Sequence, residues 1–453
     1  MEKGSAPATL FVACVVCAAL AVLMPAPALP QAIAAAQQNP LPPQPANPPR
    51  ADTTQPPPVR ITLDDAIRLA LQHDHALAAA RTTILQNQAQ EITANLRPNP
   101  VISWDSQFFP LFHPEEFGTS YLNTQAQFDI GIGYLFERGR KRQHRLEAAR
   151  DQTEQTRDTV NDNQRQLIFN LSQQFVAVLL AQSTIDLANQ DLDSFQQTVD
   201  ISNERYKLGD MSEGDLLKIR LQLLQFQSDL SSARVAKLQA LASLRQYLGF
   251  ESVPDNYDVA GQLAYDPIRE GLDDLKALAL RSRPDLQAAQ QGVVAARSQE
   301  TLAEANGKRD LNVSFDYTHT NGQSSGAFYF NIDLPIFDRN QGEIARTKYA
   351  ITQAQEQQLE AAQQVLTDVT SAFANLKSND EIIRLYQGGY VDQAKESRDI
   401  SEYSYKRGAA SLLDYLDSER TYRANQLAYR QALASYMTAV EQMRQAVGTR
   451  VLP

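Results

Sequence analysis

Two turns that carry carboxylates are the parts of this 453-residue chain with the clearest potential for chemistry. In each turn, a Tyr-Lys-x-Gly sequence is followed by an aspartate six residues after the glycine, so Gly209 leads to Asp215 and Gly408 leads to Asp414. The second turn adds Asp417, and its spacing of three residues from Asp414 places both carboxylates on one face of a helix. Carboxylates grouped in this way can attract cations. An aspartate near a helix start is also commonly a solvated group that only favours the helix dipole.

The repeated turn indicates an internal duplication. Its two glycines lie 199 residues apart, close to half the length of the chain without its N-terminal segment. A repeat of this size affects the interpretation of the whole fold, because each copy should form the same arrangement of elements. The two halves are therefore expected to contain the same helices and strands in the same order.

Patterns typical of enzymes and metal sites are missing from the sequence. The five histidines are scattered, and no Ser-His-Asp or zinc-ligand spacing occurs. His73 and His75 flank Asp74, but residues two apart point to different sides of a helix, so this segment is expected to be an exposed turn. The only cysteines, Cys14 and Cys17, lie in the N-terminal segment. The sequence therefore predicts neither an enzyme nor a bound metal or cofactor.

The N-terminus has the layout of a cleaved secretory signal. Residues 1–28 contain a lysine, then an apolar run too short for a clear membrane span, and then a small-residue cleavage site. Residues 29–60 form a predicted disordered leader, since nine prolines occur between positions 36 and 60 without a periodic apolar pattern. A retained anchor and a lipid attached to Cys14 are the alternatives for this region.

The charge balance and the hydropathy pattern limit the class of protein further. Lys and Arg total 42 against 53 acidic residues, and the net charge of −11 disfavours nonspecific nucleic-acid binding. After the N-terminal segment, no 18-residue stretch is continuously apolar, so no further transmembrane helix is expected. The long polar stretches instead indicate extended helices with much of their surface in water.

Both halves show the same order of elements, namely a helix, two strands, a long helix, a turn and a returning helix. The first repeat is assigned to residues 61–262, the second to 263–449, and a C-terminal tail to 450–453. Alternation of apolar and polar residues predicts strands at about 101–108, 124–136, 310–318 and 326–334. Helical spacing predicts helices at 61–96, 139–207 and 212–248, then at 272–305, 342–406 and 412–447, with tip turns at 205–215 and 403–414.

The lengths of these elements point to an oligomer in a membrane. The helices predicted over 139–207 and 342–406 are uninterrupted, and each would extend about 100 Å at 1.5 Å per residue. The apolar strand faces, about nine residues long, match a tilted membrane-spanning strand, and only a closed barrel satisfies the strand backbone in lipid. Four strands in one chain are too few to close, so closure requires further copies.

These features together resemble a TolC-type outer-membrane efflux protein over residues 61–449. The resemblance rests on the duplicated order of elements, on the Leu-Asp-Asp helix openings at Leu63 and Leu272, and on the turn YSYKRGAASLLDYLD with the long helix after it. It implies a mainly α fold with a β-barrel portion. In such a homotrimer, twelve strands form one outer-membrane barrel, and long helices continue it as a periplasmic α-helical barrel.

The resemblance also gives the tip residues a function. Asp414 and Asp417 match the family's aspartates that line the periplasmic aperture, where six carboxylates from three chains would favour cations. Asp215 and Tyr405 match a hydrogen bond that ties neighbouring tips together. Opening is then expected to be an untwisting of the tip helices that separates the carboxylates.

One position departs from the family pattern. The resemblance leads us to expect an arginine two residues after the second glycine, but Ala410 occupies that position. The latch that this arginine would make is therefore absent, and Arg407 and Lys406 are the neighbouring candidates to replace it.

The implied function is that of a passive exit duct, without chemistry, in the outer membrane and the periplasm. Its implied partners are two further copies of the chain, a periplasmic adaptor (membrane fusion) protein, an inner-membrane RND-type transporter and outer-membrane lipid, with no nucleic acid. The alternative is a periplasmic coiled-coil scaffold or adaptor without a pore, since adaptors also use long hairpins. The resemblance includes the heavy-metal efflux branch, but it does not distinguish between metal ions, drugs and other small molecules as the exported cargo.

Overall fold

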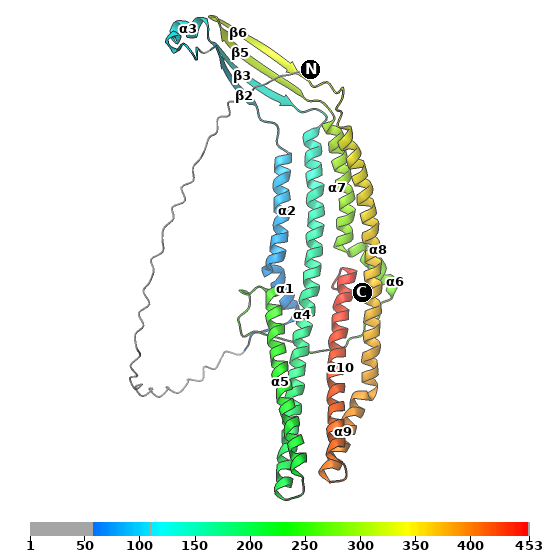
Figure 1. Ribbon diagram of the computed structural model, residues 1–453. Helices are drawn as coiled ribbons and strands as arrows, with labels where there is room; N and C mark the ends of the chain where they lie inside the picture. Colours follow the sequence, from blue (N-terminus) through cyan, green and yellow to red (C-terminus); the bar gives the residue numbers. More distant parts are fainter. Residues whose placement is uncertain (1–57, 109, 452–453) are drawn as a thin grey trace, which may run out of the picture. The chain divides into compact units, whose positions relative to one another are not determined.

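The computed structural model describes residues 58–108 and 110–451, so the predicted signal peptide and most of the predicted leader lie outside the described residues. The first half contains β1 (Arg60–Ile61), α1 (Leu63–His73), α2 (His75–Ala94), β2 (Val101–Gln107), η1 (Pro114–Glu116), α3 (Thr119–Thr124), β3 (Gln127–Phe136), α4 (Lys141–Lys207) and α5 (Glu213–Leu248). The second half contains β4 (Asp258–Val259), α6 (Leu272–Ser282), α7 (Pro284–Asn306), β5 (Leu311–Thr320), β6 (Gln323–Asn331), α8 (Gln341–Leu385), η2 (Tyr386–Tyr390), α9 (Val391–Lys406) and α10 (Leu412–Val447). A helix pair, a strand pair, a long helical segment and a returning helix therefore occur in both halves (Figure 1).

The opening helix of each half is divided in two. The helix predicted over 61–96 ends first at His73 and restarts at His75, because Asp74 has an extended backbone with ψ of 119°. The Asp74 carboxylate caps α2 by accepting a backbone N–H at 2.7 Å. In the second half, Arg283 divides the predicted helix, since a residue before proline favours an extended backbone. The prediction of single helices was wrong at these two points, whereas both histidines are exposed, as predicted.

Four strands form one antiparallel sheet in the order β2-β3-β5-β6. The central pair joins the two halves of the chain, with Phe136 of β3 opposite Leu311 of β5. β2 and β6 are the edge strands, and each pairs with one neighbour among the described residues. The sheet lies at the end of the long helices where α4 begins, and the helical hairpin turns lie at their other end (Figure 1).

The strand boundaries differ from the predicted ones around the loops. β3 begins at Gln127 rather than at 124, because Thr119–Thr124 forms α3 instead. β5 and β6 are joined by Asn321 and Gly322, whose φ values of 50° and 75° produce a tight two-residue hairpin. This hairpin brings the start of β6 forward, so the strand covers Gln323–Asn331 rather than 326–334.

The sheet has one apolar face and one polar face. Residues that lie directly opposite each other share a face, and the apolar rows are Ile102, Ile132, Phe315 and Phe328, then Trp104, Ile130 and Tyr317. The intervening row on the other face is Ser103, Gly131, Asp316 and Ala327. In the single chain the apolar face is open, with Trp104 77% exposed and Phe328 68% exposed. The predicted alternation of apolar and polar residues is confirmed.

The long helices of the two halves differ. α4 runs without a break for 67 residues, about 100 Å, as predicted. Its counterpart is interrupted, because α8 ends at Leu385 and the five-residue π-helical segment η2 precedes α9. Gly389 in this segment has φ of 107°, which is strained for any residue with a Cβ. The prediction of one uninterrupted helix over 342–406 was wrong, because it passed over the Gly388-Gly389 pair.

Each half of the chain has its own apolar core, which holds its helices together. In the first, α1, α4 and α5 pack around buried side chains that include Leu171 and Phe175, which are 0% and 3% exposed. In the second, α6, α8 and α10 pack around Leu275, Val365 and Met443, all 0% exposed. Among the described helices, α4 alone has a length and composition that would allow a membrane span. Its residues Leu171 and Phe175 nevertheless pack into the first core.

Candidate functional site

The two long hairpins end in the same backbone turn. Gly209 follows α4 with φ of 81°, and Gly408 follows α9 with φ of 75°. In both turns, the residue after the glycine donates its N–H to the carbonyl oxygen five residues earlier, at 2.9 Å. This bond and the left-handed glycine form a common helix C-cap. The duplicated sequence pattern thus corresponds to duplicated geometry at the two turns.

Asp215 and Asp414 cap the helices that follow these turns. Ser212 Oγ accepts the N–H of Asp215 at 3.1 Å, and Ser411 Oγ accepts the N–H of Asp414 at 3.2 Å. Each serine hydroxyl donates in return to the aspartate carboxylate, at 2.9 and 2.7 Å. The hydrogen bond from Ser212, with a further one from Lys218, lowers the pKa of Asp215 below its ordinary value. In each chain the two aspartates therefore stabilise the helix starts at the hairpin ends.

Asp414 and Asp417 project from the start of α10. Both are exposed in the single chain, and the Asp417 side chain is 72% exposed. The ion pair of Asp417 with Arg420 is long, at 4.0 Å, so it restrains the carboxylate weakly. Two accessible carboxylates at one helix end can attract a cation.

Tyr405 packs against Tyr415 and is not bonded to Asp215 within the described chain. It is 7% exposed, and its ring centroid lies 5.4 Å from that of Tyr415, with the planes 7° apart. The Arg205 guanidinium lies 5.5 Å from the Tyr405 ring centroid. Burial raises the pKa of the Tyr405 hydroxyl, and this hydroxyl makes no hydrogen bond to Asp215. The predicted tie between Asp215 and Tyr405 is therefore not made inside one protomer.

Ala410 provides no latch, and the two basic residues near it are engaged locally. Lys406 Nζ lies 2.6 Å from the Glu402 carboxylate, one helical turn earlier. The Arg407 guanidinium lies 5.2 Å from the ring centroid of Tyr403. Both side chains therefore contact their own hairpin in the described chain.

An aromatic cluster joins the two hairpins near their turns. The Phe195 ring of α4 lies 4.8 Å from that of Phe226 in α5 and 6.5 Å from that of Tyr415 in α10. Thr198 Oγ1 lies 3.3 Å from the Tyr415 hydroxyl, and Tyr405 completes the buried cluster. Residues of the other hairpin therefore help to bury the Phe195 side chain.

A cross-hairpin ion cluster lies beside these rings. Arg423 of α10 places Nε 3.0 Å from the Asp191 carboxylate of α4 and Nη2 2.7 Å from the Asp229 carboxylate of α5. Its guanidinium also lies 4.4 Å from the Phe226 ring centroid. Burial raises the pKa of Asp191, which the Arg423 charge opposes. These residues were not predicted from the sequence, because each lies in a polar stretch of a long helix and 194 or more residues separate Arg423 from its partners.

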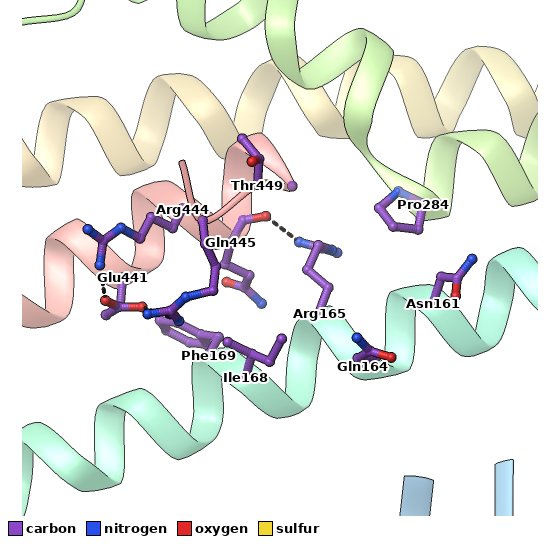
Figure 2. Close-up of a pocket in the computed structure, with 12 residues that line it drawn as sticks. Asn161, Gln164, Arg165, Ile168, Phe169, Pro284, Glu441, Arg444, Gln445 and Thr449 are labelled. Carbon is purple, nitrogen blue, oxygen red and sulfur yellow. Dashed lines mark hydrogen bonds and ion pairs between the residues drawn. The ribbon is translucent and has the colours of Figure 1, made fainter. Parts of the chain in front are cut away.

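A separate cavity of about 290 Å³ lies between α4 and the end of α10 (Figure 2). Arg165 crosses it to donate to the Gln445 carbonyl oxygen at 2.6 Å. Glu441, 5% exposed, pairs with Arg444 and, at 3.5 Å, with Arg450. These pairs satisfy the carboxylate and fix the end of α10. In the described residues no group of three or more His, Cys, Asp or Glu side chains could hold a metal ion.

Comparison with known proteins decides the family. The model of the family described as outer membrane efflux protein matches residues 66–250 and 275–449. The chain belongs to the outer membrane efflux protein family. Both halves match, and the second matched range includes Asp414 and Asp417. This member is therefore an outer-membrane channel component of an efflux system that extends into the periplasm, which decides against the alternative of a scaffold or adaptor without a pore.

Individual relatives and structures agree with this family. The cobalt-zinc-cadmium resistance protein CzcC of Cupriavidus metallidurans is 24% identical over 80% of this chain and 84% of its own. The pyoverdine export outer membrane protein OpmQ of Pseudomonas putida is 24% identical over 83% of this chain and 84% of its own. A crystal structure of CusC aligns with a TM-score of 0.71 and 19% identity over 88% of this chain and 96% of that one. This last likeness shows that the fold is shared.

Proposed function

We propose that three copies of this chain form one exit channel, with twelve strands closed into an outer-membrane barrel. The observation that carries this proposal is the four-stranded sheet, which has an open apolar face and two edges without a partner among the described residues. Exposed edges favour pairing with another copy, and β6 of one copy can pair with β2 of the next. The strands contain 7, 10, 10 and 9 residues, close to the ~9–11 that a tilted membrane strand needs.

The apolar rows of the sheet would then face lipid, and the polar rows would line the barrel interior. Trp104 and Phe328 lie on the lipid face, whereas Asp316 lies on the inner face. The helices that begin at the sheet would continue the duct through the periplasm as an α-helical barrel. α4 alone provides about 100 Å of this length.

The hairpin turns would form the periplasmic gate. Three copies would bring Asp414 and Asp417 together as a ring of carboxylates, and such rings favour cations over anions. Asp215 and Tyr405 do not bond within a chain, so their proposed hydrogen bond would join neighbouring tips. Separation of the tips would widen the ring and open the duct.

The duct would work with a periplasmic adaptor protein that contacts the tips and with an inner-membrane RND-type transporter that supplies energy. The names of two relatives refer to metal resistance and to pyoverdine export, which are chemically different cargoes. A passive duct fits this difference, because the transporter selects the cargo. The chain itself then needs neither a cofactor nor catalytic residues.

Assembly in the membrane tests this proposal. We expect the expressed protein to fractionate with the outer membrane and to migrate during electrophoresis as a trimer that dissociates only on boiling. Deletion of β6 should abolish the trimer, because one edge of the sheet is lost. A soluble periplasmic monomer would contradict the proposal.

A further inference from the structure

Glu419 is a buried carboxylate between the two hairpins. It lies on α10, one helical turn after Tyr415, and is 5% exposed. Its Oε2 atom has no hydrogen-bond partner among the described residues, and Arg398 Nη1 of α9 stands 3.9 Å away, beyond hydrogen-bond distance. An ionised carboxylate with one oxygen removed from water and left without a hydrogen bond is costly, so this environment favours the neutral form.

Other carboxylates face Glu419 from the neighbouring helices. Asp191 of α4 is 6% exposed and Glu402 lies on α9. Burial is the main cause that raises the pKa of Glu419 to about 7, Arg398 opposes this rise, and Asp191 and Glu402 add to it. The group therefore titrates near neutral pH while the hairpins are packed.

The cations around Glu419 are engaged with other carboxylates. Arg423 of α10 bonds Asp191 and, across α5, Asp229, at 3.0 and 2.7 Å. Arg398 lies 2.9 Å from the Asp399 carboxylate. Arg423 and Arg398 therefore neutralise other groups, and neither makes a close pair with Glu419.

Two further cations near this cluster, Lys406 and Arg430, also have polar partners. Lys406 of α9 pairs with Glu402 at 2.6 Å. Arg430 of α10 donates to Ser183 Oγ of α4 at 3.1 Å and to Gln426. The cluster as a whole thus joins α4, α5, α9 and α10, the four helices that form the two hairpins.

We propose that Glu419 is a proton-controlled contact between the hairpins: its protonated form allows them to pack, and its ionised form favours their separation. This inference rests on the proposed function only in taking hairpin separation as opening of the duct. The contact between the hairpins belongs to each single chain, so it can be measured apart from conduction.

The direction of the pH effect follows from the environment of the carboxyl group. The pKa of Glu419 is about 7 in the packed state and returns toward its ordinary value of 4.5 in water. Packing is therefore strongest at low pH and is weakened as pH rises through 7. Between pH 5.5 and 8.5, linkage predicts that the packing equilibrium constant falls ~30-fold per protomer.

Distances between two spin labels test this inference. Cysteines introduced by Gln227→Cys in α5 and Gln393→Cys in α9 place a label on an exposed position of each hairpin. Cys14 and Cys17 are replaced by serine so that only positions 227 and 393 carry labels, and the purified protein is mixed with excess unlabelled chain, so that the distance is measured within one protomer. We expect the distance to increase as the pH rises from 5.5 toward 7 and to level off above pH 7. An unchanged distance from pH 5.5 to 8.5 would overturn the inference.

Substitutions identify the group that titrates. Glu419→Gln should keep the short distance at every pH, and Glu419→Leu should behave in the same way because only the charge matters. Glu441→Gln is the matched control, since Glu441 lies on the same helix and is also 5% exposed but is paired with Arg444 and Arg450. This control should follow the original chain. A full pH response in Glu419→Gln would exclude Glu419 as the titrating group.

Channel conductance separates this inference from the proposed gate. If the distance responds to pH while conductance does not, the proton-controlled contact stands and the tips are not the gate. If conductance changes with pH while the distance is constant, the inference fails and the channel proposal stands.

Discussion

The ring of Tyr405 stacks on that of Tyr415, with the centroids 5.4 Å apart and the planes within 7° of parallel. Tyr405 belongs to α9 and Tyr415 to α10, and Phe195 of α4 extends the row of rings to the other hairpin at 6.5 Å. The contact between the hairpins is therefore mainly aromatic at the tip, and the ion cluster lies beside it. The tip cluster is distinct from the apolar cores of the two halves.

Removal of the central ring should loosen the tip. Tyr415→Ala removes both stacking contacts, and loss of a buried aromatic side chain typically costs about 3–5 kcal/mol. Hydrogen exchange should become faster in residues 192–226 and 405–423 while the sheet stays protected. Tyr403→Ala is the control, because Tyr403 is 61% exposed. Equal exchange rates in the two variants would contradict the importance of the stack.

Loss of the cross-hairpin cation should destabilise the same contact. Arg423→Met leaves the Asp191 and Asp229 carboxylates without their cation, at a cost of about 3–5 kcal/mol. Limited proteolysis should then cleave the hairpins faster. Arg420→Met should have little effect, since the Arg420 side chain is 79% exposed. Addition of Asp191→Asn and Asp229→Asn to the Arg423 variant should restore resistance, and failure to do so would show that the lost packing of Arg423 matters more than its charge.

The two glycines of η2 should respond differently to the same substitution. Gly389→Ala forces a Cβ onto a residue with φ of 107°, which costs on the order of 1–3 kcal/mol. Gly388→Ala introduces the same methyl group where no other atom lies within 4 Å, and the φ of Gly388 is not positive. Helix unfolding followed by circular dichroism should begin at a lower temperature for Gly389→Ala alone. A matching decrease in both variants would mean that the left-handed backbone at Gly389 does not limit stability.

The two faces of β6 should tolerate charge differently. Phe328→Lys puts a cation on the apolar face, at a cost of about 2–4 kcal/mol if this face meets lipid at mid-membrane. Ser325→Lys puts the same group on the polar face, in the row of Asp105, Asp129 and Thr318. We expect the yield of boiling-sensitive trimer in the outer membrane to fall only for Phe328→Lys. Loss of trimer in the Ser325 variant alone would reverse the assignment of the two faces.

The elements that were predictable from sequence are those set by local rules. The strand faces followed from alternation, and α4 followed from 67 residues without a proline or glycine. Its counterpart was predicted wrongly, because a Gly-Gly pair allows a helix to break without requiring it, and Gly389 takes the left-handed conformation. The interruptions at Asp74 and Arg283 were missed for a similar reason, since both segments keep helical spacing across the break.

The candidate site was predictable only in part. The repeated glycine and aspartate pattern located both turns, because their C-caps and N-caps are made within a few residues. The ion cluster could not be found in this way, since charged residues such as Arg423 and Glu419 are usual on the solvated face of a long helix. Their burial depends on how the two hairpins pack, and the partners of Arg423 are 232 and 194 residues away.

The most direct test of the proposed gate is single-channel conductance in planar bilayers of the original protein and of the variant Asp414→Asn with Asp417→Asn. Asparagine keeps a side-chain oxygen for Ser411, so the α10 cap should persist while the charge is lost. Asp210→Asn, an exposed change in the other turn, is the control. We predict that the double variant loses cation block and cation preference while the control retains both. Unchanged conductance and cation block in the double variant would contradict the carboxylate gate.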